Sequence, residues 1–251
     1  MEVTYIGHSG FLMEWDTCYW LFDYFKGEIP KLKDGKKLFV FSSHNHKDHF
    51  NPVVFQLYEK HPDVIYVLSS DIKLKNDGYP EKGITDEKMA EIMKKIIIVK
   101  PSTRYELYDN DNNQIVMETL KSTDAGVAFL LRYNGKTTYH AGDLNLWLWE
   151  ECTKQENNNM KAMFEREMEH LKDVEIDYAF APLDPRQEIY YDQGLEYLLH
   201  TAKIKYVFPM HFWGKPEVIQ QFKQGRAIDP YTTIIDIENE GQKWTFWQRK
   251  L

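Results

Sequence analysis

The stretch FSSHNHKDHFNP, residues 41–52, places three histidines and one aspartate within six consecutive positions. The apolar run LFVF precedes the cluster, and Asn51 and Pro52 suit the N-cap and the first position of a helix. We therefore expect the cluster on a loop between a buried strand and a helix. Because neutral imidazoles beside a carboxylate contribute little to an apolar core, the cluster predicts a bound cation.

The spacing inside the cluster predicts two ions. His44 and His46 lie two residues apart, so on an extended chain they point the same way and can bind one ion. Asp48 and His49 follow a chain reversal and can point at a second ion beside it. Nitrogen and oxygen donors together suit zinc, with manganese or iron as alternatives.

Two later segments repeat the arrangement of an apolar strand followed by a possible ligand. TTYHAG leads into Asp143, and KYVFPM leads into His211. Loops at the ends of strands often meet to form binding sites. A carboxylate such as Asp143 can bridge two cations, so these segments are expected to complete the site.

Composition limits the kinds of partner. The chain of 251 residues has a net charge of -8 and no run of Lys and Arg, which argues against nucleic acid. The two cysteines, Cys18 and Cys152, form no motif, so a reducing cytoplasm is expected. No signal peptide and no membrane-spanning apolar run are visible. We expect a cytoplasmic protein acting on a small molecule, with homo-oligomers possible.

Strand and helix patterns mix along the whole chain and no linker interrupts them, which predicts one layered α/β domain over residues 1–251. In the helix expected at 157–171, Met160, Met163 and Met168 fall on one stripe that is expected to pack in the core. Strands are expected at 3–7, 10–15, 18–25, 37–43, 64–70, 96–100, 115–120, 127–133, 136–140, 176–182 and 205–209. Helices are expected at 51–61, 85–95, 157–171, 195–202 and 216–223, and a hairpin at 232–247.

HNHKDH, YHAGD and FPMHF, in that order, resemble the metallo-β-lactamase-fold superfamily of hydrolases, as do YIGHSGFLME and CYWLFDYF with its strand-end Asp23. The resemblance implies a four-layer αβ/βα sandwich with the site along one edge. It implies one metal ion on His44 and His46, and a second on Asp48, His49 and His211, with Asp143 between them. GHSGF together with YHAGD is similar to the branch of ascorbate-phosphate lactonases.

One expected ligand is missing, because the superfamily supplies a further His between HNHKDH and YHAGD and this chain has none in residues 62–139. Asp124, at the end of a strand and just before Gly126, is the best replacement. The alternative is that Asp124 only caps a turn. Without it the first site is weak, and the protein would work with one ion.

Other side chains have two interpretations each. His8, in a Gly-His-Ser-Gly turn, is expected near the metals or in a structural role only. Arg186 could clamp a phosphate or carboxylate, or simply pair with Asp184. His140 could orient a ligand or face the core. Packing is expected for His200, and solvent exposure for His61 and His170.

These observations predict a metal-dependent hydrolase, with two zinc ions expected and manganese or iron(II) possible. It uses a metal-bound hydroxide, with Asp48 as a ligand that also orients the nucleophile. The substrate expected is a small-molecule ester, either a lactone or a phosphorylated metabolite. The alternatives are a phosphodiesterase or nuclease of the same fold, and a metal-binding scaffold without turnover.

Overall fold

The structure is a computed structural model that describes residues 1–74 and 84–246. The chain divides into two compact units. The first unit comprises residues 1–100, 107–114 and 239–251, and the second comprises residues 101–106 and 115–238. The prediction of one domain over residues 1–251 stays a prediction.

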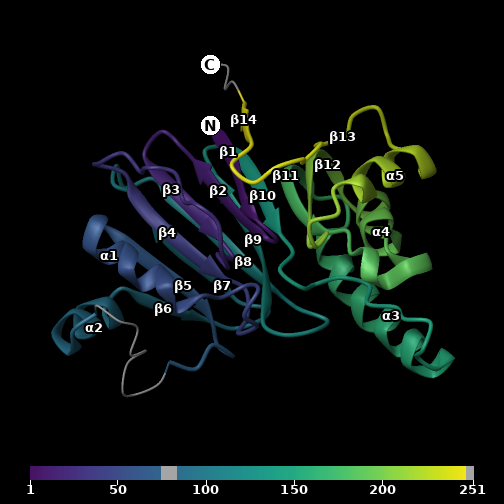
Figure 1. Ribbon diagram of the computed structural model, residues 1–251, viewed down its shortest axis with the longest axis horizontal. Helices are drawn as coiled ribbons and strands as arrows, with labels where there is room; N and C mark the ends of the chain where they lie inside the picture. The colour runs from purple at the N-terminus through teal and green to yellow at the C-terminus, as the bar shows by residue number, and fades with distance from the viewer. Residues whose placement is uncertain (75–83, 247–251) are drawn as a thin grey trace. The chain divides into compact units, whose positions relative to one another are not determined.

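The first unit is built on a mixed seven-stranded sheet of order β14-β1-β2-β3-β4-β5-β6 (Figure 1). Strands β14, β1, β2 and β3 pair antiparallel, whereas β3, β4, β5 and β6 run parallel. The strands are β1 (Glu2–Gly7), β2 (Gly10–Glu14), β3 (Cys18–Phe22), β4 (Lys37–Ser42), β5 (Val64–Ser69), β6 (Ile96–Val99) and β14 (Lys243–Thr245).

Short helices cover one face of this sheet. The 3₁₀ helix η1 (Pro52–Gln56) continues into α1 (Leu57–Lys60), and α2 (Asp86–Met93) precedes β6. Val54 and Phe55 of η1 are buried in one cluster with Leu38, Val40 and Tyr66 of the sheet. The Asn51 side chain accepts from the Val53 N–H, as the sequence predicts, so the helix begins directly after the histidine cluster.

The second unit contains the other seven-stranded sheet, of order β13-β12-β11-β10-β9-β8-β7. β8, β9 and β10 pair antiparallel, and β10, β11, β12 and β13 run parallel. The strands are β7 (Arg104–Tyr108), β8 (Gln114–Lys121), β9 (Val127–Tyr133), β10 (Lys136–His140), β11 (Glu175–Pro182), β12 (Lys203–Met210) and β13 (Thr233–Ile234).

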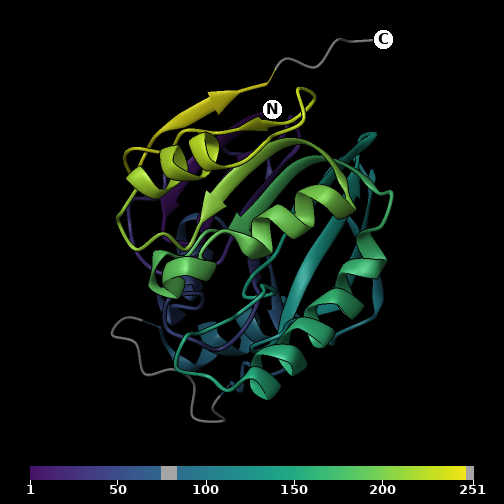
Figure 2. The same cartoon turned by 90° about the vertical axis from the view of Figure 1, so that its right-hand side faces the viewer.

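Three α-helices lie over one face of this second sheet, in front of its strands in Figure 2. They are α3 (Lys154–Met168), α4 (Gln193–Thr201) and α5 (Glu217–Gly225), with the short 3₁₀ helices η2 (Glu169–Leu171) and η3 (Pro185–Tyr190) between them. Thr153 and Glu156 form a capping box that fixes the start of α3. Each helix buries apolar residues on one side, such as Phe164 of α3, Leu195 of α4 and Phe222 of α5.

Several local predictions fail for tertiary reasons. The expected hairpin at 232–247 is wrong for the residues described, because β13 pairs with β12 and β14 pairs with β1, in different sheets. β7 was not predicted, since Arg104 and Glu106 interrupt its apolar pattern. The methionine stripe of α3 is only partly buried, with Met168 in the core and Met163 39% exposed.

In the part of the chain that is described, no helix is both long and apolar enough to cross a membrane.

Candidate metal centre

In the first unit, the ends of two neighbouring parallel strands build the base of the candidate site. β3 ends at Phe22 and β4 at Ser42, so Asp23 stands beside Ser43. The Asp23 carboxylate accepts from the Ser43 N–H over 2.7 Å and from the Ser43 hydroxyl over 2.6 Å. Asp23 is buried and has a φ of 40°, a left-handed conformation that is uncommon outside glycine. The strand pairing therefore brings a buried carboxylate to the start of the histidine cluster.

This carboxylate orients two of the histidines. His49 Nδ1 lies 2.8 Å from Asp23 Oδ2, so its N–H donates to the carboxylate. The Ser43 hydroxyl already donates to Asp23, so it accepts from His44 Nδ1, which lies 2.9 Å away. In both rings the proton is then on Nδ1, and Nε2 is the nitrogen with the lone pair. Metal-binding histidines are commonly held in this way.

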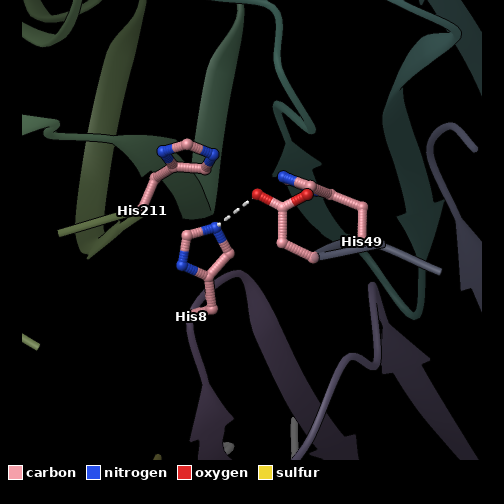
Figure 3. Close-up of side chains that lie close together, drawn as sticks. His8, His49 and His211 are labelled. Carbon is pink, nitrogen blue, oxygen red and sulfur yellow. Dashed lines mark ion pairs between the residues drawn. The ribbon is translucent and has the colours of Figure 1, made fainter. Parts of the chain in front are cut away.

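Asp48, His8 and His49 form the second part of the first unit's cluster. His8 Nε2 lies 3.3 Å from Asp48 Oδ2 (Figure 3). The His8 and His49 rings lie edge to face with centroids 5.6 Å apart. Burial would raise the pKa of Asp48, but the hydrogen bond from His8 opposes it, and the pKa is held below its ordinary value. Asp48 is therefore a carboxylate, the form that binds a cation.

His46 completes the cluster from its exposed side. Its ring centroid lies 4.5 Å from that of His44, whose own centroid is 4.2 Å from that of His49. His46 is exposed, whereas His44 and His49 are fully buried. The structure of the first unit thus brings together His8, His44, His46, Asp48 and His49, all of which the sequence analysis selected.

In the second unit, the ends of β10, β11 and β12 build a comparable base. Asp143 follows β10, Asp184 follows β11 and His211 follows β12. His211 Nδ1 lies 2.9 Å from Asp184 Oδ2, and His211 Nε2 lies 3.4 Å from Asp143 Oδ1. Asp184 therefore fixes the proton of His211 on Nδ1, as Asp23 does for His49. The ring is drawn in Figure 3.

Asp184 receives further donors from a surface pair. The Arg186 guanidinium binds both oxygens of Asp184 through Nε and Nη2, and Trp213 Nε1 lies 3.3 Å from Oδ2. Burial would raise the pKa of Asp184, but the hydrogen bonds from His211 and Arg186 lower the pKa to about 2. The alternative of an Asp184–Arg186 pair is thus realised, while a direct role of Arg186 in catalysis stays a prediction.

Asp124 lies in the turn between β8 and β9, with its N–H donating to Ser122 Oγ over 3.1 Å. Its carboxylate is exposed and offers an oxygen within 4.8 Å of one from Asp143. The neighbouring Thr123 hydroxyl donates to the Asn145 carbonyl over 2.6 Å, which joins this turn to the Asp143 loop. The second unit therefore brings Asp124 to the side of Asp143, as a replacement ligand would require.

The remaining histidines can now be assigned. His140 is buried, and its Nδ1 accepts from the Gly142 N–H, so it supports the turn that leads to Asp143. His61 is buried and bonded to the Lys36 carbonyl, so the expected solvent exposure is wrong. His200 is exposed on α4, so the expected packing role is also wrong, because its ring turns outward to the Glu196 carbonyl. His170 is exposed as expected.

The residues of each unit fit divalent metal ions. The first unit offers imidazole nitrogens whose partners on Nδ1 leave Nε2 as the ligand atom, together with the Asp48 carboxylate. The second unit offers two carboxylates and His211 in the same tautomer. Nitrogen and carboxylate donors together suit zinc, iron or manganese rather than magnesium or calcium.

Comparisons with known proteins bear on the fold. No family model matches the sequence, and no curated protein matches it. Among solved structures, Igni18, a metallo hydrolase from the archaeon Ignicoccus hospitalis, superposes with a TM-score of 0.64 at 16% identity over 99% of both chains. The metallo-β-lactamase fold protein YhfI from Bacillus subtilis gives a TM-score of 0.58 at 12% identity, over 97% of this chain and 99% of YhfI. The chain has the metallo-β-lactamase fold.

The predicted fold is therefore confirmed, and a third solved structure agrees with it. The isothiocyanate hydrolase from Delia radicum gut bacteria has a TM-score of 0.51 at 12% identity, over 98% of this chain and 99% of that chain. At these identities the likeness establishes the metallo-β-lactamase fold alone.

Within the metallo-β-lactamase fold, sequence reasoning missed the residues that orient the candidate ligands. Ser43 was not considered, although it directly precedes His44. Asp184 was considered only as a partner of Arg186, and its hydrogen bond to His211 depends on the parallel pairing of β11 with β12. A polar residue at the end of each buried strand was the available signal. The sequence alone does not tell which strands are neighbours.

Proposed function

We propose that the chain is a metal-dependent hydrolase that binds two divalent ions, zinc in the first place and manganese or iron(II) as alternatives. His44 and His46 would hold one ion, with Asp124 as a further ligand. Asp48, His49 and His211 would hold the other, and Asp143 could serve both ions. His8 contacts Asp48 and would also contact the substrate.

The observation that carries this proposal is the shared orientation of His44 and His49. Both rings are fully buried, and both have Nδ1 engaged by Ser43 or Asp23. Their centroids are only 4.2 Å apart. Two buried imidazoles that lie this close, each with Nε2 as the acceptor, contribute little to the stability of an apolar core. It is the arrangement that a metal ion needs.

The second unit offers matching support. His211 is held by Asp184 in the same tautomer, and its Nε2 lies 3.4 Å from an oxygen of Asp143. Asp124 offers a further carboxylate oxygen beside Asp143. An oxygen ligand in place of the superfamily's usual histidine makes the first site harder, which favours manganese or iron(II) more than three imidazoles would.

The chemistry follows from these groups. A bound divalent ion lowers the pKa of water to about 7 and stabilises the oxyanion that develops on the substrate. Asp48 stays ionised because its pKa is lowered, so it can accept a hydrogen bond from the attacking water and orient it. His8 donates to the same carboxylate and keeps it in place. A Ser-His or Cys-His nucleophile is not required.

The substrate that we propose is a small-molecule ester, first a lactone or a phosphorylated metabolite, handled by a cytoplasmic enzyme. A phosphodiesterase of the same fold is the second candidate, because the same ions can stabilise a phosphoryl group. A metal-holding scaffold without turnover is the third candidate, since residues 62–139 lack the further histidine that the superfamily supplies. The net charge of -8 argues against long nucleic acids.

The test compares His46→Ala with Lys47→Ala, a matched control on the same exposed loop. Hydrolysis of a panel of lactones and of bis-p-nitrophenyl phosphate is measured for both variants and for the unmodified protein, with circular dichroism as a check of the fold. We expect His46→Ala to lose at least about 100-fold in turnover, because loss of even an outer partner of a metal ligand costs about 10–100-fold. Lys47→Ala should retain turnover.

The panel separates the candidates. Hydrolysis of lactones but not of bis-p-nitrophenyl phosphate supports the esterase. Hydrolysis of bis-p-nitrophenyl phosphate but not of lactones supports the phosphodiesterase. Bound metal with no turnover of either class supports the scaffold. Full activity in a folded His46→Ala protein would contradict the assignment of His46 as a ligand.

A further inference from the structure

Beside His211, the second unit carries a stacked pair of side chains that the proposed mechanism does not use. The Arg186 guanidinium stacks on the Trp213 ring with its carbon 4.4 Å from the ring centroid. The Arg186 side chain is 47% exposed and Trp213 is 42% exposed. A charged group and a large aromatic ring thus lie together at the surface, where an ordinary arginine would move freely.

Asp184 connects this pair to His211. Its Oδ2 accepts from His211 Nδ1 over 2.9 Å, from Arg186 Nη2 over 2.5 Å and from Trp213 Nε1 over 3.3 Å. Asp184 itself has no exposed surface. The Asp184 carboxylate therefore connects the exposed side chains of Arg186 and Trp213 to His211, a candidate metal ligand.

The geometry of Arg186 leaves part of its guanidinium for another anion. The hydrogen bonds from its guanidinium to Asp184 use Nε and Nη2. Within residues 1–74 and 84–246, no side chain of the structure accepts from Nη1. Arginine offers five N–H donors in a fixed fork, so a second oxyanion can bind at the free edge without breaking the pair with Asp184.

The backbone of this segment also points to a function. His211 has a φ of 64° and Trp213 a φ of 52°, both in the left-handed region, where each non-glycine residue costs about 1 kcal/mol or more. Such strain persists where the surrounding structure holds it, and it concentrates at ligand-binding sites. Here it presents the His211 and Trp213 side chains from the same short turn after β12.

We propose that Arg186 and Trp213 form a specificity subsite for an anionic group of the substrate, a carboxylate or a phosphate, beside the metal centre. This rests on the proposed function and narrows it to esters that carry such a group apart from the bond that is hydrolysed. Asp184 acts as the positioning residue, since it holds Arg186 against Trp213. A cation bound at His211 would add to the attraction for the anion.

The experiment titrates the full-length protein, as purified, with benzoate and separately with inorganic phosphate by isothermal calorimetry. Arg186→Gln removes the guanidinium. Arg132→Gln is the matched control, because Arg132 is a 42% exposed arginine of the same unit that pairs with Glu118. Zinc content is measured on every sample, so a failure of metal binding is seen separately from a failure of the subsite.

We expect at least one of the two anions to bind the unmodified protein and Arg132→Gln equally, and to bind Arg186→Gln about 10-fold more weakly or worse. Arg186→Lys should recover only part of the loss, because lysine keeps the charge but not the fork or the stacking. Tighter binding of benzoate would indicate a substrate with a carboxylate, and tighter binding of phosphate would indicate a phosphorylated substrate. Equal affinities of Arg186→Gln and Arg132→Gln, or no binding of either anion to the unmodified protein, would overturn the subsite.

Discussion

At the scale of single residues, Asp23 and Asp184 play the same part in the two units. Each follows a parallel strand, each is fully buried, and each accepts from Nδ1 of a histidine that we assign as a ligand. A carboxylate on Nδ1 fixes the ring orientation and makes Nε2 more basic. The same arrangement, a buried carboxylate that accepts from a histidine Nδ1, thus occurs in both units. Neither aspartate needs to contact a metal ion to affect metal binding.

In the proposed site, the first ion depends on Asp124. We predict that Asp124→Ala lowers the number of metal ions per chain by about one, because the remaining ligands of that ion are too few to hold it tightly. The measurement is elemental analysis after dialysis, with Asp34→Ala, an exposed aspartate of the other unit, as the control. An unchanged metal count would mean that Asp124 is only a turn residue.

At the scale of elements, a buried polar network joins the loops that carry the second unit's candidate ligands. Thr123 donates to the Asn145 carbonyl, the Asn145 amide donates to Gln187 Oε1 over 2.9 Å, and Gln187 donates to the carbonyls of Leu146 and Leu148. These residues connect the turn of Asp124, the loop of Asp143 and η3. The network therefore helps to position the carboxylates of Asp124 and Asp143, although neither residue belongs to it.

Gly194, at the start of α4, packs directly against this network. A Cβ at this position would lie 1.9 Å from Asn145 Oδ1, so Gly194→Ala must displace the Asn145 side chain. We expect a loss of about 1–3 kcal/mol in the free energy of unfolding, measured by urea denaturation. Gly225→Ala is the control, since nothing lies within 4 Å of its added Cβ. Equal stability of the two variants would contradict the network's tight packing.

The same scale explains what the sequence could and could not predict. Apolar runs such as those of β4 and β12 are long and regular, so the strands and the ligands that follow them were predicted. The pairing of strands is a tertiary property, so the hydrogen bond between Asp23 and His49 could not be predicted. For the same reason the segments of β13 and β14, adjacent in sequence, were mistaken for a hairpin. Whether the selected residues bind metal stays a prediction.

At the scale of the whole molecule, the proposed ligands are drawn from both compact units. Of these proposed ligands, His44, His46, Asp48 and His49 belong to the first unit, and Asp124, Asp143 and His211 belong to the second. Such a site cannot form in the unfolded chain, so metal binding adds to the stability of the folded protein.

The most direct test is native mass spectrometry of the full-length protein purified without added metal, combined with elemental analysis of the same sample. The account predicts two divalent ions per folded chain, lost together with thermal stability after treatment with a chelator. A folded chain that carries no tightly bound metal ion, and that takes up none when zinc or manganese is supplied, would contradict it.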